Sequence, residues 1–161
     1  KETSAQGPPV VSLADGFHGR LARCCNPVPG DPILGYVTRG SGIAVHRADC
    51  NNILYRARRE PERVMTLRWS DEAREQAFRV WVEVVAVDRR GLLSHIAAIV
   101  SDAGINIHAA EGKAEEPGLA KLWLEVEVSH RAQLTYLLDR LQAVADVVSA
   151  REVPAHVRPA V

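Results

Sequence analysis

Three cysteines and one histidine carry the clearest chemistry of this sequence. Cys24 and Cys25 are adjacent, and His46 and Cys50 follow with three residues between them. Three thiolates and one imidazole are a ligand set of closed, tetrahedral structural zinc sites. A small, turn-rich unit gains stability from such a cross-link. The four side chains are therefore predicted to bind zinc.

Two other interpretations of the cysteines stay open at this point. The adjacent pair departs from the usual Cys-x2-Cys spacing, and neighbouring side chains turn inward together only from an unusual backbone. In the second interpretation the cysteines are small core residues, and His46 is a surface residue beside Arg47. A cysteine nucleophile is the third, although no base, orienting carboxylate and oxyanion hole are recognisable together.

The charge of the chain is zero overall but unevenly distributed. Residues 1–70 hold 10 Lys and Arg against 6 Asp and Glu, and residues 71–161 hold 10 against 14. Residues 39–59 alone contain five arginines and one aspartate. This asymmetry favours an anionic partner for the first half, nucleic acid included. A basic face that only contacts water is the alternative.

Composition and length narrow the class of protein. The chain has 161 residues, 47% hydrophobic and 25% charged, which is typical of one medium or two small globular domains. No apolar run approaches the roughly 20 residues that span a bilayer, so we expect no membrane partner. An odd number of cysteines is a poor disulfide framework and favours a reducing, cytoplasmic location. The polar start of the sequence lacks the hydrophobic region of a secretory signal. Because the sequence opens on Lys1 rather than an initiator methionine, we expect a fragment of a longer protein.

Changes in composition along the chain divide it into segments. We expect an α+β protein with two folded units. The predicted segments are a disordered or linker start at 1–12, a small cysteine-containing α/β module at 13–69, a linker at 70–76, a second domain at 77–154 and a tail at 155–161.

The first unit is predicted to contain a hairpin followed by a helix. Strands at 35–39 and 43–46 flank a glycine-containing turn. Asp49 is predicted to cap a helix that ends near Arg59, and a third strand follows at 64–69. The second pair of metal ligands would then lie between the hairpin and the helix.

The second unit shows a clearer pattern. Apolar residues alternate in strands and recur at helical spacing between them, in the order βαββαβ. That order predicts a ferredoxin-like fold, in which an antiparallel four-stranded sheet carries both helices on one face. The predicted strands are 78–86, 105–110, 122–128 and 147–153, the helices run from Leu92 to Ala103 and from a cap at Ser129 to Val144, and 112–118 is a polar loop.

Two tryptophans of the second unit are out of phase with its main apolar faces. Trp81 and Trp123 stand at strand positions that point away from those faces. We expect them to cover the other face of the sheet by pairing with another copy or domain. Such pairing would make the chain a homodimer through its second unit.

Three runs of residues resemble one known family. They are LARCCNPVPGD at 21–31, GYVTRG at 35–40 and VHRADC at 45–50. In this order they resemble the conserved-cysteine module of the long RelA/SpoT homologues, the bacterial stringent-response enzymes that make or hydrolyse (p)ppGpp. In that family the module, also called a zinc-finger or ribosome-inter-subunit domain, precedes an ACT domain, which the second unit resembles. The resemblance covers about residues 13–153.

The resemblance implies a regulatory C-terminal fragment. The family's synthetase and hydrolase domains lie upstream and match no part of this chain, so we expect no active site here. The family's module is described as binding zinc at the positions of Cys24, Cys25, His46 and Cys50. Its region contacts large-subunit rRNA on ribosomes that carry uncharged tRNA. The residues expected at that contact are Arg39, Arg47, Arg56, Arg58 and Arg59, with Arg20 and Arg23 nearby.

ACT domains commonly sense amino acids, so the resemblance also implies a ligand site. Backbone N–H groups at a helix N-terminus can hold a carboxylate, and apolar neighbours suit a branched side chain. The candidate residues are Asp88, Arg89, Arg90, Gly91, Leu92, Asn106, Ile107 and His108. A structural alternative stays open, in which Gly91 permits a turn, Asp88 caps the helix and Asn106 satisfies a strand edge.

Two functions follow from the sequence and the resemblance together. In the first, the chain contacts ribosomal RNA and relays the state of starvation to catalytic domains of the same protein. In the second, the ACT domain binds a branched-chain amino acid and shifts the balance between hydrolase and synthetase. The two functions do not exclude each other.

Overall fold

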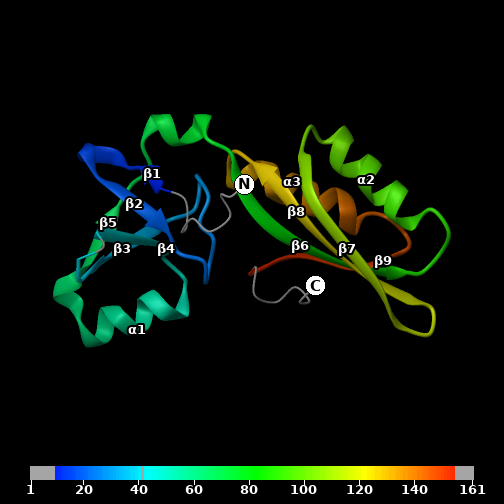
Figure 1. Cartoon of the computed structure of the whole chain (residues 1–161), viewed down its shortest axis with the longest axis horizontal. Coiled ribbons are helices and arrows are strands. Elements are labelled where there is room, and N and C mark those ends of the chain that lie inside the picture. Colours follow the sequence, from blue (N-terminus) through cyan, green and yellow to red (C-terminus); the bar gives the residue numbers. More distant parts are fainter. Residues whose placement is uncertain (1–9, 41, 155–161) are drawn as a thin grey trace. The chain divides into compact units, whose positions relative to one another are not determined.

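The computed structural model describes residues 10–40 and 42–154 (Figure 1). The predicted tail at 155–161 and most of the predicted disordered start lie outside the described residues. The chain divides into two compact units, with the boundary between Gln76 and Ala77. Within the described ranges, no helix has both the length and the apolar composition that crossing a bilayer requires.

The first unit is built on a five-stranded sheet with the strand order β1-β2-β4-β3-β5. Neighbouring strands are antiparallel, except that β2 pairs in parallel with β4. In the described part of the unit, one α-helix and three 3-10 helices accompany the sheet. The elements are β1 Val10–Ser12, β2 His18–Leu21, β3 Ile33–Thr38, β4 Gly42–Arg47, α1 Asn51–Arg59 and β5 Val64–Leu67, with 3-10 helices at Ala14–Gly16, Pro61–Arg63 and Asp71–Glu75.

Tight packing across the β3–β4 hairpin fixes the centre of this sheet. Gly35 on β3 lies opposite Val45 on β4 and Met65 on β5. A Cβ at Gly35 would lie 2.5 Å from a methyl of Leu67 and 2.8 Å from one of Ile43. Only glycine therefore lets these side chains close over the middle of β3.

Three details of the first unit differ from the simplest expectation. Val10–Ser12, predicted to be disordered or a linker, forms edge strand β1 against β2. Asp71–Glu75, in the predicted linker, forms a 3-10 helix whose first turn is capped by the Ser70 hydroxyl. The N-cap of α1 is Cys50 rather than Asp49, because the Asp49 carboxylate instead accepts hydrogen bonds from Arg47.

The second unit has the predicted ferredoxin-like order βαββαβ. Its four-stranded antiparallel sheet has the order β7-β8-β6-β9, and α2 and α3 lie on one face (Figure 1). Val80, Val82 and Val84 of β6 are fully buried, as the alternation predicts. The elements are β6 Phe78–Val87, α2 Leu92–Asp102, β7 Asn106–Glu116, β8 Leu119–Val128, α3 Arg131–Gln142 and β9 Val147–Val153.

Two local expectations for the second unit are wrong. The predicted loop at 112–118 is mostly strand, because β7 continues to Glu116 and turns into β8 near Gly118, whose φ is 85°. The N-cap of α3 is His130 rather than Ser129, since the His130 ring accepts a hydrogen bond from the Gln133 N–H. Ser129 instead donates its own N–H to the Gln133 side chain at 2.8 Å.

The face of this sheet opposite the helices carries the two tryptophans. Trp81 and Trp123 are only 6% and 5% exposed and form a cluster with Val153. Beside them, buried Glu83 accepts a hydrogen bond from Arg151 at 2.9 Å. This burial removes the exposed aromatic surface on which the expectation of a second copy was based, and the homodimer stays a prediction.

Candidate functional site

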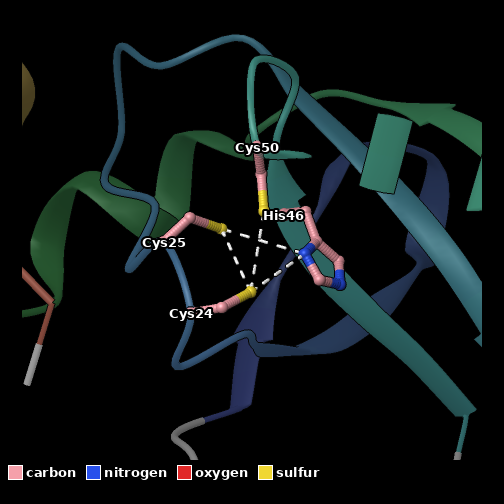
Figure 2. Close-up of side chains that lie close together, drawn as sticks. All are labelled: Cys24, Cys25, His46 and Cys50. Carbon is pink, nitrogen blue, oxygen red and sulfur yellow. Dashed lines mark hydrogen bonds between the residues drawn. The ribbon is translucent and has the colours of Figure 1, made fainter. Parts of the chain in front are cut away.

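The four predicted metal ligands converge on one point of the first unit (Figure 2). Cys24 and Cys25 lie in the turn after β2, His46 is on β4, and Cys50 directly precedes α1. The Cys24 Sγ lies 3.5 Å from His46 Nδ1, 3.6 Å from Cys50 Sγ and 4.0 Å from Cys25 Sγ. The Cys25 Sγ lies 3.8 Å from His46 Nδ1, and all four donor atoms are within 4.8 Å of one another.

These distances can be compared with the edges of a zinc tetrahedron. Zinc binds sulfur at about 2.3 Å and imidazole nitrogen at about 2.0–2.1 Å, so the edges measure about 3.8 Å between sulfurs and about 3.5 Å between sulfur and nitrogen. The four measured separations run from 3.5 to 4.0 Å. The donor atoms therefore have the types of a tetrahedral zinc site, and these four separations are close to its edge lengths.

The backbone around the vicinal pair explains how both cysteines face the cluster. Residues 23–25 form one helical turn, in which the Asn26 N–H donates to the Ala22 carbonyl at 3.0 Å. Successive side chains in a helical turn point about 100° apart, whereas those of a strand point to opposite faces. Asn26 then leaves the turn in the left-handed region, with φ 45°. The helical turn therefore allows the side chains of both adjacent cysteines to face the cluster.

The proline-rich segment after the cysteines is tied down by one buried carboxylate. Asp31, 8% exposed, accepts a hydrogen bond from the Val28 N–H at 3.0 Å. Its backbone carbonyl accepts another from Trp69 Nε1 at 2.9 Å. Val28 itself is fully buried. These contacts make the turn that carries the cysteines part of the folded core.

Burial sets the protonation of the ligands in the absence of metal. It raises the pKa of Cys24 and of Cys25, so both are thiols at neutral pH. Burial, together with the positive charge of Arg56, lowers the pKa of His46 and keeps its imidazole in the neutral form that binds metals. The Arg47 N–H donates to the Cys25 Sγ at 3.3 Å, a contact that stabilises a thiolate. Metal binding would thus release protons from the cysteines.

Helix α1, next to this cluster, carries the predicted arginine contacts. The Arg56 guanidinium donates to Glu60 Oε2 at 2.9 Å and to the Tyr36 hydroxyl at 3.1 Å, and it lies 4.7 Å from the Tyr36 ring centroid. Arg63 lies over the same ring at 5.4 Å. Hydrogen bonds from Arg56 and then Tyr36 lower the pKa of the Glu60 carboxyl. Arg56 therefore belongs to a clamp that holds α1 against β3.

The other predicted arginines differ in their partners. Arg47 makes two hydrogen bonds to Asp49, at 3.1 and 3.0 Å. Arg59 lies over the Tyr55 ring at 5.4 Å. Arg39 and Arg58 are exposed and have no ion-pair partner within the described part of the chain. Arg20 and Arg23 are also exposed.

Sequence reasoning missed the aromatic partners of these arginines. Tyr55 and Arg59 are four residues apart in a helix, a spacing that places them on one face and is visible in the sequence. The Tyr36–Arg56 contact joins residues 20 apart, and no local pattern indicates it.

The candidate ligand site of the second unit is a cavity of about 350 Å³ between the start of α2 and strands β7 and β8. Four of the predicted residues line it, namely Asp88, Arg89, Gly91 and Leu92. The rest of its lining comes from α2 and from strands β7 and β8, namely Leu93, Ser94, Gly112, Lys113, Ala114, Ala120 and Leu122. Lys113 lines the cavity because β7 extends through the segment that was predicted to be a loop.

The remaining predicted ligand residues lie outside this cavity. Asn106 and His108 both contact Glu127, and these hydrogen bonds, that of His108 first, lower the pKa of the Glu127 carboxyl. Arg90 and Ile107 do not line the cavity either. Arg89, at the rim of the cavity, forms an ion pair with Asp146 and donates a hydrogen bond to His95 Nδ1 at 2.7 Å.

Both units match family models. Residues 9–70 match the RelA/SpoT RIS domain, and residues 74–151 match an ACT domain. A GTP pyrophosphokinase of Streptomyces coelicolor is 38% identical over 150 residues, 93% of this chain and 18% of that protein. One of Escherichia coli K12 is 35% identical over 146 residues, 90% of this chain and 20% of that protein. The chain thus spans about a fifth of the length of these curated relatives.

The solved structures that the chain resembles include an ACT domain. The ACT domain from a GTP pyrophosphokinase of Chlorobium tepidum is 24% identical, with a TM-score of 0.44, and covers 48% of this chain and 100% of its own. The two family models and the curated relatives confirm the resemblance found in the cysteine and proline motifs. The chain therefore consists of a RelA/SpoT RIS domain followed by an ACT domain.

Proposed function

We propose that this chain is a regulatory region that contacts ribosomal RNA through the basic surface of its RIS domain, without doing chemistry of its own. On a ribosome that holds uncharged tRNA, this contact would relay starvation to catalytic domains of the same protein, which make or hydrolyse (p)ppGpp. The observation that carries the proposal is α1, an exposed helix with three arginines and no acidic residue.

The charges of this helix suit a phosphate backbone. Arg58 and Arg59 of α1, and Arg39 at the end of β3, are exposed. A guanidinium is permanently charged and can bind two phosphate oxygens at once. Because Arg56 is held by Glu60 and Tyr36, we assign the phosphate contacts to Arg39, Arg58 and Arg59.

A zinc ion would give this surface its rigidity. Cys24, Cys25, His46 and Cys50 would hold the ion as a closed structural site, since four protein ligands leave no open position for substrate. Cys50 is also the N-cap residue of α1. The ion would thus fix the start of the RNA-contacting helix to β4 and to the turn after β2.

Sedimentation with ribosomes tests the RNA contact. The zinc-loaded chain should pellet with large ribosomal subunits, and each lost phosphate contact should reduce the salt dependence of log K by about 0.7–0.9. Arg39→Glu/Arg58→Glu/Arg59→Glu should weaken binding strongly. The control Arg74→Glu/Arg90→Glu/Arg140→Glu, with the same change in net charge, should weaken it little. Binding that responds to neither salt nor the first triple substitution would contradict the proposal.

A second function is favoured by the cavity of the ACT domain. Lys113 supplies a cation, and Leu92 and Leu122 supply apolar lining, in a space of about 350 Å³. We propose that this cavity binds the carboxylate and side chain of a branched-chain amino acid, whose binding would shift the hydrolase and synthetase balance of the whole protein. Valine or isoleucine at millimolar concentration should raise the melting temperature, with glycine as control. No thermal shift and no heat of binding would exclude this sensing function.

A further inference from the structure

Two tyrosines of the RIS domain stack with arginines, but their surroundings differ. Tyr36 is half-buried, and its hydroxyl donates to Glu60 while Arg56 and Arg63 lie over its ring. Tyr55 is 50% exposed, and Arg59 lies over its ring at 5.4 Å. The Tyr36 stack fastens α1 to β3, whereas the Tyr55 stack fastens the helix to no other element of the described chain.

The helix that carries Tyr55 is exposed along most of its length. Among the nine residues of α1, only Ile53 is buried and Ala57 is half-buried. Asn51, Tyr55 and Arg58 follow at spacings of four and three residues, so they share one face of the helix. That face presents an amide, an aromatic ring and a guanidinium to solvent. The adjoining Leu54 is 38% exposed.

The charge of α1 selects the class of molecule that this face would bind. Its nine residues include three arginines and no aspartate or glutamate. An aromatic ring that a guanidinium flanks, on a helix of this charge, has the chemistry with which proteins hold unpaired nucleic-acid bases. The ring provides a stacking surface, and the guanidinium groups contact the backbone phosphates on either side.

We propose that Tyr55, with Arg59, stacks on an unpaired base of the RNA, so that α1 recognises a loop or bulge rather than a continuous duplex. The inference rests on the proposed RNA contact and adds a residue that discriminates between RNA structures. Asn51 and Arg58 lie on the same face of α1, where they adjoin the base and its phosphate. Base stacking on an aromatic side chain contributes about 1–3 kcal/mol, so removal of the ring should weaken binding about tenfold or more.

The second unit contains a matched tyrosine for comparison. Tyr136 on α3 is 51% exposed and has Arg140 over its ring at 5.7 Å, with the same spacing of four residues. Its hydroxyl accepts a hydrogen bond from Arg140 at 2.9 Å, and α3 also carries Asp139. Exposure and an arginine four residues away are thus common to both tyrosines, whereas only α1 lacks an acidic residue. Tyr136→Ala therefore serves as the control.

The test uses the zinc-loaded chain and large ribosomal subunits, with two chemical probes of the RNA. Hydroxyl radicals report backbone contacts, and acylation of ribose 2′-hydroxyls reports unstacked, mobile nucleotides. Tyr55→Ala should weaken binding about tenfold and restore acylation at one or a few unpaired nucleotides, while backbone protection at saturating protein is retained. Tyr55→Phe should behave as the unsubstituted chain, since stacking needs the ring and not the hydroxyl. Tyr136→Ala should change neither measurement.

The possible results separate this inference from the proposed function. If the unsubstituted chain does not bind ribosomal subunits, the RNA contact fails. If it binds and Tyr55→Ala changes neither affinity nor acylation, only the stacking inference is overturned. Loss of backbone protection in Tyr55→Ala at saturation would also overturn it, because the ring would then support the fold. The zinc content of each variant checks that the domain remains folded.

Discussion

The RIS and ACT domains reach stability in different ways. Among the described residues, ten buried apolar side chains belong to the first unit, which contains the RIS domain, and 22 to the second, which contains the ACT domain. Most of the buried ACT side chains lie between the sheet and its two helices, and Trp81, Trp123 and Val153 form a cluster on the opposite face. The RIS domain instead joins its segments through directed contacts, namely the cysteine–histidine cluster, the Tyr36 clamp and the Asp31 bonds. A domain with an exposed helix and fewer buried apolar side chains depends more on such contacts.

Metal removal should produce the largest difference between the two domains. A chelator, or Cys50→Ser, should unfold the RIS domain, because structural zinc contributes on the order of 10 kcal/mol in small domains. The amide signals of the ACT domain should remain in a two-dimensional NMR spectrum. Metal analysis should give about one zinc per chain before treatment. A metal-free chain with an unchanged RIS spectrum would show that the cluster is only a set of small core residues.

Acid should reverse zinc binding in the same domain. Because burial raises the pKa of Cys24 and Cys25, protons compete strongly for their sulfurs, and zinc affinity should rise with pH. A titration of bound zinc with a chromophoric chelator, from pH 8 to pH 5, should show its release as the pH falls. Affinity independent of pH would exclude thiolate ligation.

A cavity in the ACT core should have the next largest effect. Leu137 on α3 is fully buried, so Leu137→Ala should lower the free energy of unfolding of this domain by about 2–5 kcal/mol. Leu93→Ala, at a position 48% exposed, should change it by less than about 0.5 kcal/mol. Both variants should bind zinc normally. Loss of zinc from Leu137→Ala would mean that the two domains unfold together.

Replacing a strand glycine by alanine should destabilise the sheet of the RIS domain more than the sheet of the ACT domain. Gly35→Ala in the RIS domain meets two side chains, at 2.5 and 2.8 Å, and should destabilise that domain by about 1–3 kcal/mol. Gly112→Ala on β7 meets only the end of Leu122 at 2.8 Å and should have a smaller effect. Thermal unfolding of the zinc-loaded chain measures both. A larger effect at Gly112 would reverse the comparison.

The smallest expected effect concerns a surface carboxylate of the ACT domain. Hydrogen bonds from His108 and Asn106 lower the pKa of Glu127 below 4.5. The ionised form therefore stabilises the fold above this value, and the contribution disappears as the pH falls through the lowered pKa. Glu127→Gln should lower the melting temperature slightly at pH 7 and not at pH 3, whereas Glu115→Gln should have no such pH dependence. An equal difference at both pH values would contradict the stabilisation of the Glu127 carboxylate by these hydrogen bonds.

Sequence patterns predicted the ACT fold well, because long strands and helices repeat their apolar positions many times. They missed β1 and β2, since strands of three and four residues are too short for alternation to be visible. They ended β7 too early because Glu111 and Lys113 suggest a loop, although an edge strand accepts charged residues. The residue types of the four side chains identified the candidate zinc ligands. The helical turn that brings Cys24 and Cys25 to the same cluster depends on backbone geometry, which the residue types do not reveal. Arg56 differs from the other arginines because its guanidinium contacts Tyr36, and this contact could not be predicted because Tyr36 is distant in sequence.

The parallel pairing of β2 with β4 has a consequence for the order in which the RIS domain assembles. The β3–β4 hairpin and the segment that carries His46 and Cys50 are local, so they can form early. Strand β2 pairs with β4 on the side away from β3, so residues 22–32, which include Cys24 and Cys25, pass over β4 to reach β3. We therefore expect His46 and Cys50 to be in place first during folding. The addition of Cys24 and Cys25 to the cluster would be the last step and would complete the fold of the domain.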